Sequence, residues 1–256
     1  MIRIGVSGMT AYNVGVAVTA NNIANSNTTA YKKGRVRFSE ATLRSSKILK
    51  RNISGAVYSP SASSGGGVAA NRVSRNNIQG MISLSQNPTD MAISGEGFFQ
   101  VILPDGRLAY TRNGAFQKSS DGILVTAEGY ELQPQIKIPP NAENIIVEGD
   151  GEVKAKIGAE NITIGRIQTA QFQNPDGLKS AGAGLLTETA SSGQAIIGTP
   201  GSGGFGGIIQ EGLEGSNVNM AEEQVNLIIN QRAFKANAKS VKTADAMLKY
   251  TINIKK

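Results

Sequence analysis

The C-terminal part of the chain has a regular apolar pattern. One apolar residue recurs every seven residues, at Met220, Leu227, Phe234, Val241 and Leu248. This spacing predicts an apolar line along one long helix. Asn219 is suited to cap the start of that helix, and no Gly or Pro interrupts the sequence from 220 to 256. Because a lone helix with one narrow apolar line buries too little to be stable, we expect it to pack against a partner.

The N-terminal segment carries a matching pattern. Apolar and small residues alternate at spacings of three and four through Ile2, Gly5, Met9, Tyr12, Val16, Thr19 and Ile23. This predicts a second helix that ends near the polar cluster 25–29 and pairs with the C-terminal helix. We expect the assembly interface of the pair to consist of Ile2, Met9, Val16, Ile23, Met220, Leu227, Phe234, Val241 and Leu248. An ordinary helical hairpin packed on its own domain remains the alternative.

Between the predicted helices, short apolar runs alternate with turn residues. Residues 98–103 and 108–111 flank Pro104-Asp105-Gly106-Arg107, which predicts a β-hairpin. Further strands are expected at 123–126, 135–138, 145–147, 152–157, 162–164 and 165–172. Their spacing is typical of a sandwich or barrel, so we predict an all-β domain over residues 86–185.

Gly- and Ser-rich stretches lie on both sides of this β region. Residues 59–67 resemble a flexible linker, and residues 185–215 are interpreted as a glycine-rich return connection. A nominal G-x-G-x-x-G at 201–206 follows a loop-like segment and opens no helix, which argues against a dinucleotide site.

The predicted fold class is therefore α+β and multi-domain. Coiled-coil-like terminal heptad helices (1–33 plus 216–256) enclose extended connectors (34–85 plus 186–215) and an inserted all-β domain (86–185).

Composition excludes several kinds of chemistry. The 256 residues include no Cys and no His, which removes disulfides, thiolate nucleophiles and His-based catalysis or metal binding. Carboxylates such as Asp121 and Glu128 occur at turns, where Asp and Glu are expected for local backbone reasons. We therefore predict no catalytic residue, metal ligand, cofactor or small-molecule substrate. A small β enzyme remains a remote alternative.

The net charge of +7 is unevenly distributed. Residues 1–80 hold 11 Lys/Arg and one acidic residue, whereas the remainder holds 15 Lys/Arg and 18 Asp/Glu. The basic segment lacks the interleaved aromatic residues of a nucleic-acid reader. Charge complementarity between neighbouring copies explains the asymmetry better than nucleic-acid binding does. We expect no cleaved signal peptide and no membrane span.

Three segments resemble known protein motifs. One is the run from Ala20 to Lys33, which contains Asn21, Asn22, Ile23, Ala24, Asn25, Asn27 and Thr28. The second comprises Asp90–Phe99 followed by Tyr110–Phe116, and the third runs from Glu214 to Phe234. In this order they resemble the signatures of bacterial flagellar axial proteins, the rod and hook family.

The resemblance implies a structural role. It implies a self-assembling subunit of the basal-body rod, a hollow helical shaft that transmits torque and passes exported subunits. The implied partners are further copies of the chain, other rod, hook and ring proteins, and the type III export apparatus. The chain length favours a distal rod type, with a proximal rod type or a short hook type left open. A secreted adhesin-like β protein is a more distant alternative.

Overall fold

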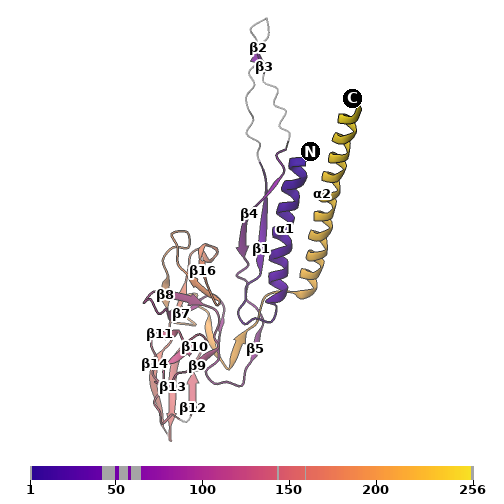
Figure 1. Cartoon of the computed structure of the whole chain (residues 1–256). Coiled ribbons are helices and arrows are strands. Elements are labelled where there is room, and N and C mark those ends of the chain that lie inside the picture. Colours follow the sequence, from indigo (N-terminus) through magenta and orange to yellow (C-terminus); the bar gives the residue numbers. More distant parts are fainter. Residues whose placement is uncertain are drawn as a thin grey trace. The chain divides into compact units, whose positions relative to one another are not determined.

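The computed structural model describes residues 2–41, 50–51, 57–58, 65–142, 144–158 and 160–254. Two helices lie at the ends of the chain, and strands lie between them (Figure 1). Helix α1 spans Ile2–Ala24 and helix α2 spans Met220–Ile254. Both helices lie where the sequence predicted them, and α2 begins directly after Asn219. The fold is α+β, as expected.

The chain forms two compact units. Residues 1–23, 34–74 and 220–256 form the helical unit, and residues 24–33 and 75–219 form the β unit. Each unit is thus assembled from segments that are distant in the sequence.

The helical unit contains α1, α2 and a small antiparallel ribbon. Strand β1 (Gly34–Glu40) pairs with β4 (Val68–Arg75), and β2 (Lys50–Arg51) pairs with β3 (Val57–Tyr58). Figure 1 shows β1 and β4 alongside α1. Phe38 of β1 packs against Tyr12 of α1, with ring centroids 5.7 Å apart. Residues 59–64 of the predicted linker lie outside the described residues.

The β unit is built around a nine-stranded sheet. Seven strands follow the order β16-β17-β8-β7-β11-β10-β9, and β15 pairs with both β7 and β18. The strands are β7 (Phe98–Ile102), β8 (Leu108–Thr111), β9 (Phe116–Lys118), β10 (Leu124–Thr126), β11 (Glu131–Gln133), β15 (Thr169–Gln171), β16 (Lys179–Gly182), β17 (Leu185–Thr187) and β18 (Ile196–Gly198). The predicted hairpin is confirmed, because β7 pairs antiparallel with β8.

Smaller sheets complete this unit. Strands β12 (Asn144–Val147), β13 (Glu152–Ile157) and β14 (Glu160–Arg166) form an antiparallel three-stranded sheet. Two further pairs join β6 (Met91–Ser94) to β19 (Gly207–Gln210) and β5 (Ile82–Leu84) to β20 (Gly212–Glu214). A short 3-10 helix spans Pro175–Gly177.

Strand β7 explains how the core is organised. Successive side chains of a strand point to opposite faces, and both faces of β7 are covered. Phe99 lies in the main core, where its ring meets Phe116 edge-on at 5.2 Å. Phe98 lies in a second cluster with Tyr110 and Phe172. The β unit therefore has its own aliphatic and aromatic core.

Two strand predictions in the β region were wrong. Residues 135–138 form no strand, although Ile136 and Ile138 are buried and Lys137 makes one isolated bridge to Ile123. Pro134, Pro139 and Pro140 surround this segment and lack the N–H groups that a ladder requires. The second wrong prediction is 165–172, which is divided between the end of β14 and β15 with residues 167–168 in neither, whereas the predicted strand 162–164 lies within β14.

The glycine-rich return segment also contains strands. Strands β18, β19 and β20 lie within it, and each pairs with a strand of the β unit. The G-x-G-x-x-G at 201–206 lies in turns before β19 and opens no helix.

Candidate functional site

The residues predicted to form an assembly interface are incompletely covered within one chain. On α1, Ile2, Met9, Val16 and Ile23 are half-buried, and Leu227 and Val241 of α2 are similar. Met220, Phe234 and Leu248 are exposed, at 43%, 37% and 51%. The apolar line is therefore present on α2, but contacts within one chain bury it only in part.

Small and amide side chains lie between the two helices. The buried positions of α1 are Gly5, Gly8, Ala11, Gly15, Thr19 and Asn22. A side-chain carbon added to Gly8 would lie 2.7 Å from Oδ1 of Asn237, and one added to Gly15 would lie 3.3 Å from the amide of Asn230. The helices run antiparallel, since higher-numbered residues of α1 meet lower-numbered residues of α2. Hydrophobic periodicity could not identify Asn230 and Asn237 as the partners on α2, because amide side chains are not hydrophobic.

One motif residue, Asn22, closes the helix pair by hydrogen bonding. Its side chain is 1% exposed, and that of Glu223 is 2% exposed. The Asn22 amide donates to Glu223 over 2.8 Å and to the carbonyl oxygen of Gly34 over 2.9 Å. Its oxygen accepts from the backbone N–H of Gly34 over 2.8 Å. Asn22 thereby ties α1, the start of β1 and the first turn of α2 together.

The other motif residues are more accessible. Asn21, Ala24, Asn27 and Thr28 are exposed, and Asn25 is half-buried. The Asn25 side chain accepts a hydrogen bond from the Thr28 hydroxyl over 3.1 Å, and the Thr28 N–H donates to the Asn25 carbonyl over 3.2 Å. These bonds close the turn that follows α1.

A second site lies within the β unit, around a fully buried carboxylate. Glu214 at the end of β20 is 0% exposed. Its two oxygens accept from Lys32 over 2.5 Å and from Nε of Arg112 over 2.8 Å. The backbone N–H of Gly80 donates to the same oxygen as Lys32, over 2.9 Å. We call Lys32, Arg112 and Glu214 the ion cluster.

The electrostatics of the ion cluster favour a charged Glu214. Burial alone would raise the pKa of Glu214, but the charge of Arg112 and the hydrogen bond from Lys32 outweigh it and hold that pKa below its ordinary value of 4.5. Burial lowers the pKa of Lys32 below its ordinary value of 10.5, and the hydrogen bond to Glu214 offsets only part of this. Loss of the carboxylate would therefore leave two cations buried together.

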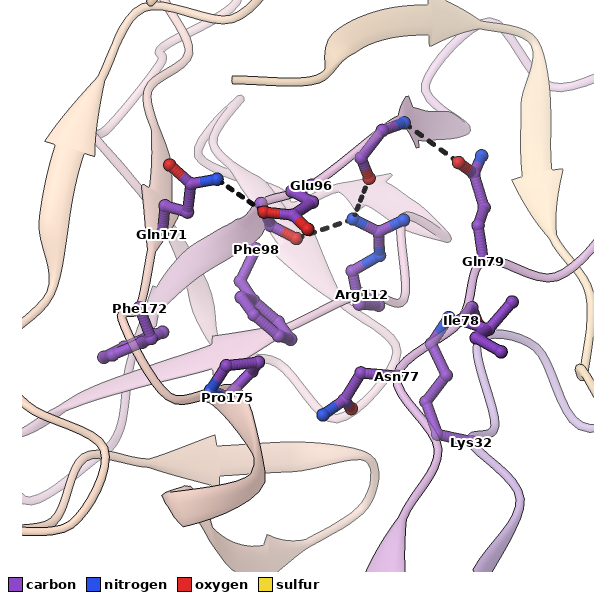
Figure 2. Close-up of a pocket in the computed structure, with 12 residues that line it drawn as sticks. Lys32, Asn77, Ile78, Gln79, Glu96, Phe98, Arg112, Gln171, Phe172 and Pro175 are labelled. Atoms are coloured by element: carbon purple, nitrogen blue, oxygen red, sulfur yellow. Dashed lines mark hydrogen bonds between the residues drawn. The ribbon is translucent and has the colours of Figure 1, made fainter. Parts of the chain in front are cut away.

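Backbone groups complete the coordination of Arg112. Its guanidinium donates to the carbonyl oxygens of Gly95, Gly97 and Ile93 over 2.8, 2.7 and 3.2 Å. Arg112 and Lys32 line a hollow of about 230 Å³ together with Phe98, Phe172 and Pro175. Figure 2 shows these side chains. Arg112 thus holds the Glu214 carboxylate and also stabilises the bend between β6 and β7.

The side chain of Asn217 binds the same region. It accepts from the N–H of Lys33 over 2.7 Å and donates to the carbonyl oxygens of Asn76 and Ile78, each over 2.8 Å. The three sequence segments that carry the family resemblance therefore meet here. The first contributes Lys32, the second Arg112, and the third Glu214 and Asn217. Sequence reasoning noted these segments but missed their ion cluster, because nothing local pairs charges that lie so far apart.

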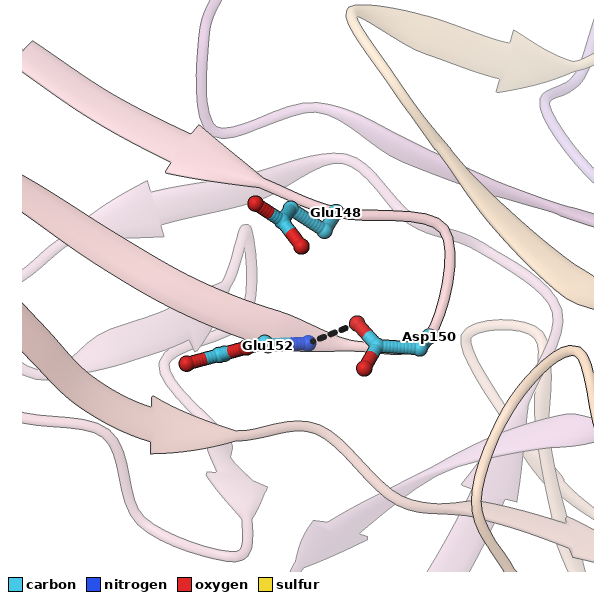
Figure 3. Close-up of side chains that lie close together, drawn as sticks. All are labelled: Glu148, Asp150 and Glu152. Carbon is cyan, nitrogen blue, oxygen red and sulfur yellow. Dashed lines mark hydrogen bonds between the residues drawn. The ribbon is translucent and has the colours of Figure 1, made fainter.

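A group of surface carboxylates has a simpler explanation. Glu148, Asp150 and Glu152 lie close together at the turn between β12 and β13 (Figure 3). Lys154 pairs with Glu148 and Glu152, and Arg166 pairs with Asp150 over 3.4 Å. Because every carboxylate of this surface group is paired with one of the two cations, we interpret it as a solvated ion network. Neither α1 nor α2 has an apolar stretch suited to crossing a membrane, and this holds for every helix in the described residues.

Comparison with protein-family models gives three consecutive matches. Residues 2–32 match the model of flagella basal body rod proteins, and residues 92–155 match the D1 domain of the flagellar hook proteins FlgE/F/G. Residues 209–254 match the C-terminal model of the flagellar basal body rod proteins FlgEFG. These matches include Lys32, Arg112, Glu214 and both helices.

Two rod proteins are similar over almost the whole chain, and a hook protein is similar over part of it. The flagellar basal-body rod protein FlgG of Caulobacter vibrioides is 39% identical, covering 99% of this chain and 98% of its own length. FlgG of Buchnera aphidicola subsp. Schizaphis graminum is 41% identical over 94% of both chains. The flagellar hook protein FlgE of Escherichia coli is 34% identical, but the match covers 52% of this chain and 32% of the hook protein.

Proposed function

The chain belongs to the family of flagellar rod and hook proteins, and on this basis we propose that it builds the distal part of the flagellar basal-body rod. The observation that carries this is end-to-end similarity to proteins named FlgG, against a partial match to a hook protein. The family is structural, so the chain is a rod subunit and not an enzyme.

The terminal helices form the wall of a hollow helical homopolymer in this proposal. Support comes from the apolar line on α2, of which Met220, Phe234 and Leu248 are left exposed in one chain. Val225, Ile228 and Ile229 of α2 are exposed as well. Several large apolar side chains left exposed on one helix favour its burial against another chain. The half-buried residues Ile2, Met9, Val16, Ile23, Leu227 and Val241 would contribute their remaining surface to the same coiled-coil-like contacts.

The functional division of the chain follows from this arrangement. Residues 1–33 and 216–256 would form the inner tube, residues 34–85 and 186–215 the connectors, and residues 86–185 the outer domain. The independent core of the β unit supports a separate outer layer. The basic segment 35–51 would contact acidic surface on neighbouring copies.

The location and partners of the subunit follow from its place in the rod. The rod would cross the periplasm, and the subunits would be exported unfolded through the flagellar type III apparatus. The absence of Cys suits a chain that is threaded through a channel. Besides further copies, the subunit would contact other rod, hook and ring proteins.

Electron microscopy of isolated basal bodies tests this proposal. A small epitope placed in the exposed turn at Asp105–Arg107 should be labelled along the distal rod, beneath the hook. Basal bodies from cells that lack this protein should be missing that rod segment. Labelling of the hook, or normal rods without the protein, would contradict the proposal.

A further inference from the structure

The α1–α2 contact repeats in layers. Positions 8, 15 and 22 of α1 face positions 237, 230 and 223 of α2. Each step is seven residues on both helices, so the layers are Gly8 with Asn237, Gly15 with Asn230, and Asn22 with Glu223. Asn230 also donates to the Thr19 hydroxyl over 3.3 Å.

Most of these layers tolerate a shift by one repeat. If α1 moved by seven residues, or about 10 Å, Gly8 would face Ala244 and Gly15 would face Asn237. These pairs are as small, or as polar, as the pairs that they replace. The line of Leu227, Phe234 and Val241 keeps its own spacing, but Val241 lies against Gly5 and would face Tyr12 after the shift. Gly8 and Gly15, by contrast, do not distinguish the two registers.

The layer of Asn22 and Glu223 distinguishes the two registers by its buried hydrogen bonds. In the observed register, the buried Glu223 carboxylate accepts from the Asn22 amide, whose remaining groups bind both backbone groups of Gly34. In the shifted register Asn22 would face Asn230, and Glu223 would lose this donor. A buried carboxylate that loses a hydrogen-bond donor is strongly disfavoured.

We propose that Asn22 and Glu223 are the positioning residues that set the register of the antiparallel α1–α2 pair. A single polar layer in an otherwise permissive helix seam is an established way to select one register at a cost in stability. The proposal concerns the fold of the helical unit and does not depend on where the subunit acts.

Disulfide mapping tests the register directly, because the natural chain has no Cys. The pair Gly8→Cys with Asn237→Cys reports the observed register, and Gly15→Cys with Asn237→Cys reports the shifted one. Each pair is placed in three backgrounds: the parent, the Asn22→Ala/Glu223→Ala double variant, and Glu223→Gln. Intramolecular and intermolecular products are separated by mass, since one chain is 26.8 kDa.

The parent should form the intramolecular observed-register product and little of the shifted one. The double alanine variant should lower the ratio of observed to shifted product by about tenfold or more. Glu223→Gln should keep the parental ratio, because an amide oxygen can still accept from Asn22. Asn25→Ala is the matched control, since Asn25 bonds to Thr28 in the turn after α1.

Three results would overturn the proposal. The first is an unchanged ratio in the double alanine variant, which would assign the register to chain connectivity. The second is equal formation of both products in the parent. The third is an exclusively intermolecular product, which would show that α1 pairs with α2 of another copy.

Discussion

Glu214 shows how a buried charge can link remote parts of a fold. Its carboxylate binds Lys32, Arg112 and the N–H of Gly80, and its own carbonyl oxygen accepts from the N–H of Ala30 over 2.7 Å. A buried pair of this kind adds little net stability compared with apolar residues of the same shape, but breaking it is costly. The ion cluster therefore specifies which segments meet more than it increases their overall stability.

The pKa of Glu214 predicts acid sensitivity of the β unit. Because its folded-state pKa lies below 4.5, the unfolded chain binds more protons between the two values. The stabilisation is complete above about pH 4.5 and is lost as the pH falls through the folded-state pKa. Urea titrations followed by circular dichroism from pH 7 to pH 3 should show the midpoint falling over this acidic window.

Substitution of Glu214 checks the origin of that effect. Glu214→Gln should cost about 3 kcal/mol or more at pH 7, because two buried cations lose their partner. It should also flatten the acidic part of the titration. Glu148→Gln, which alters an exposed pair, is the control and should leave the midpoint almost unchanged. An equal effect of both substitutions would show that the ion cluster has no special role.

Gly114 gives a second prediction at the scale of one residue. A side-chain carbon there would overlap the carbonyl oxygen of Met91, whose N–H donates to the Gly114 carbonyl over 2.9 Å. Gly114→Ala should destabilise the β unit by about 1–3 kcal/mol through overpacking. Gly149→Ala is the control, because a carbon there meets its nearest neighbour at an ordinary 3.7 Å. Thermal unfolding of both variants would reveal whether the close approach matters.

At the scale of elements, the sequence predicted those parts that depend on local pattern. The seven-residue apolar spacing located α2, and the turn at 104–107 located the β7–β8 hairpin. The seven-residue spacing pointed to Met220, Leu227 and Phe234, whereas the structure places Glu223 and Asn230 against α1. Amide and glycine contacts carry no hydrophobic signal, so geometry alone reveals them. The ion cluster joins residues up to 182 positions apart, which no local pattern encodes.

Because the β unit has its own core, we expect substitutions in the helices to affect assembly and not the fold of the β unit. Leu227 is half-buried on α2, and the β unit has its own core. Leu227→Asp would place an unpaired charge in the proposed subunit interface, which costs at least several kcal/mol per subunit in the polymer. We expect soluble protein with unchanged β-type circular dichroism, no rods by electron microscopy and no motility in cells that carry it.

A matched substitution separates position from charge. Lys239→Asp lies on the same helix at an exposed site and should leave assembly far less affected. If Leu227→Asp instead unfolds the β unit, α2 is a core element of a single globule. The proposal of a tubular assembly would then be wrong.

At the scale of the whole molecule, charge is divided between the two units. The helical unit contains 15 Lys/Arg and 4 Asp/Glu, and the β unit contains 11 Lys/Arg and 15 Asp/Glu. Their net charges are thus +11 and −4, which together give the +7 of the chain. In a polymer of identical copies, basic surface of one copy meets acidic surface of another more favourably than it meets its own kind.

This division predicts that assembly weakens with salt. Raising the ionic strength from about 0.15 to 1 M shortens the screening length from about 8 to 3 Å, so attraction between exposed charges is largely lost. Single exposed pairs contribute little, and we therefore reverse two charges together. Arg35→Glu with Arg37→Glu, both exposed on β1, should slow rod formation at low salt and reduce its salt dependence, as measured by sedimentation.

A control variant carries the same change in net charge on the β unit. It tests whether assembly depends on attraction between basic and acidic surfaces or only on the net charge of the chain. Lys118→Glu with Lys156→Glu makes the acidic unit more acidic and alters the total by the same amount. This variant should assemble at least as well as the parent, because its acidic surface attracts the basic segment more strongly. If both double variants are impaired equally, repulsion between copies governs assembly. The parent is also tested for DNA binding. If the parent binds DNA and the β1 variant assembles normally but no longer binds DNA, the basic segment is a nucleic-acid-binding segment.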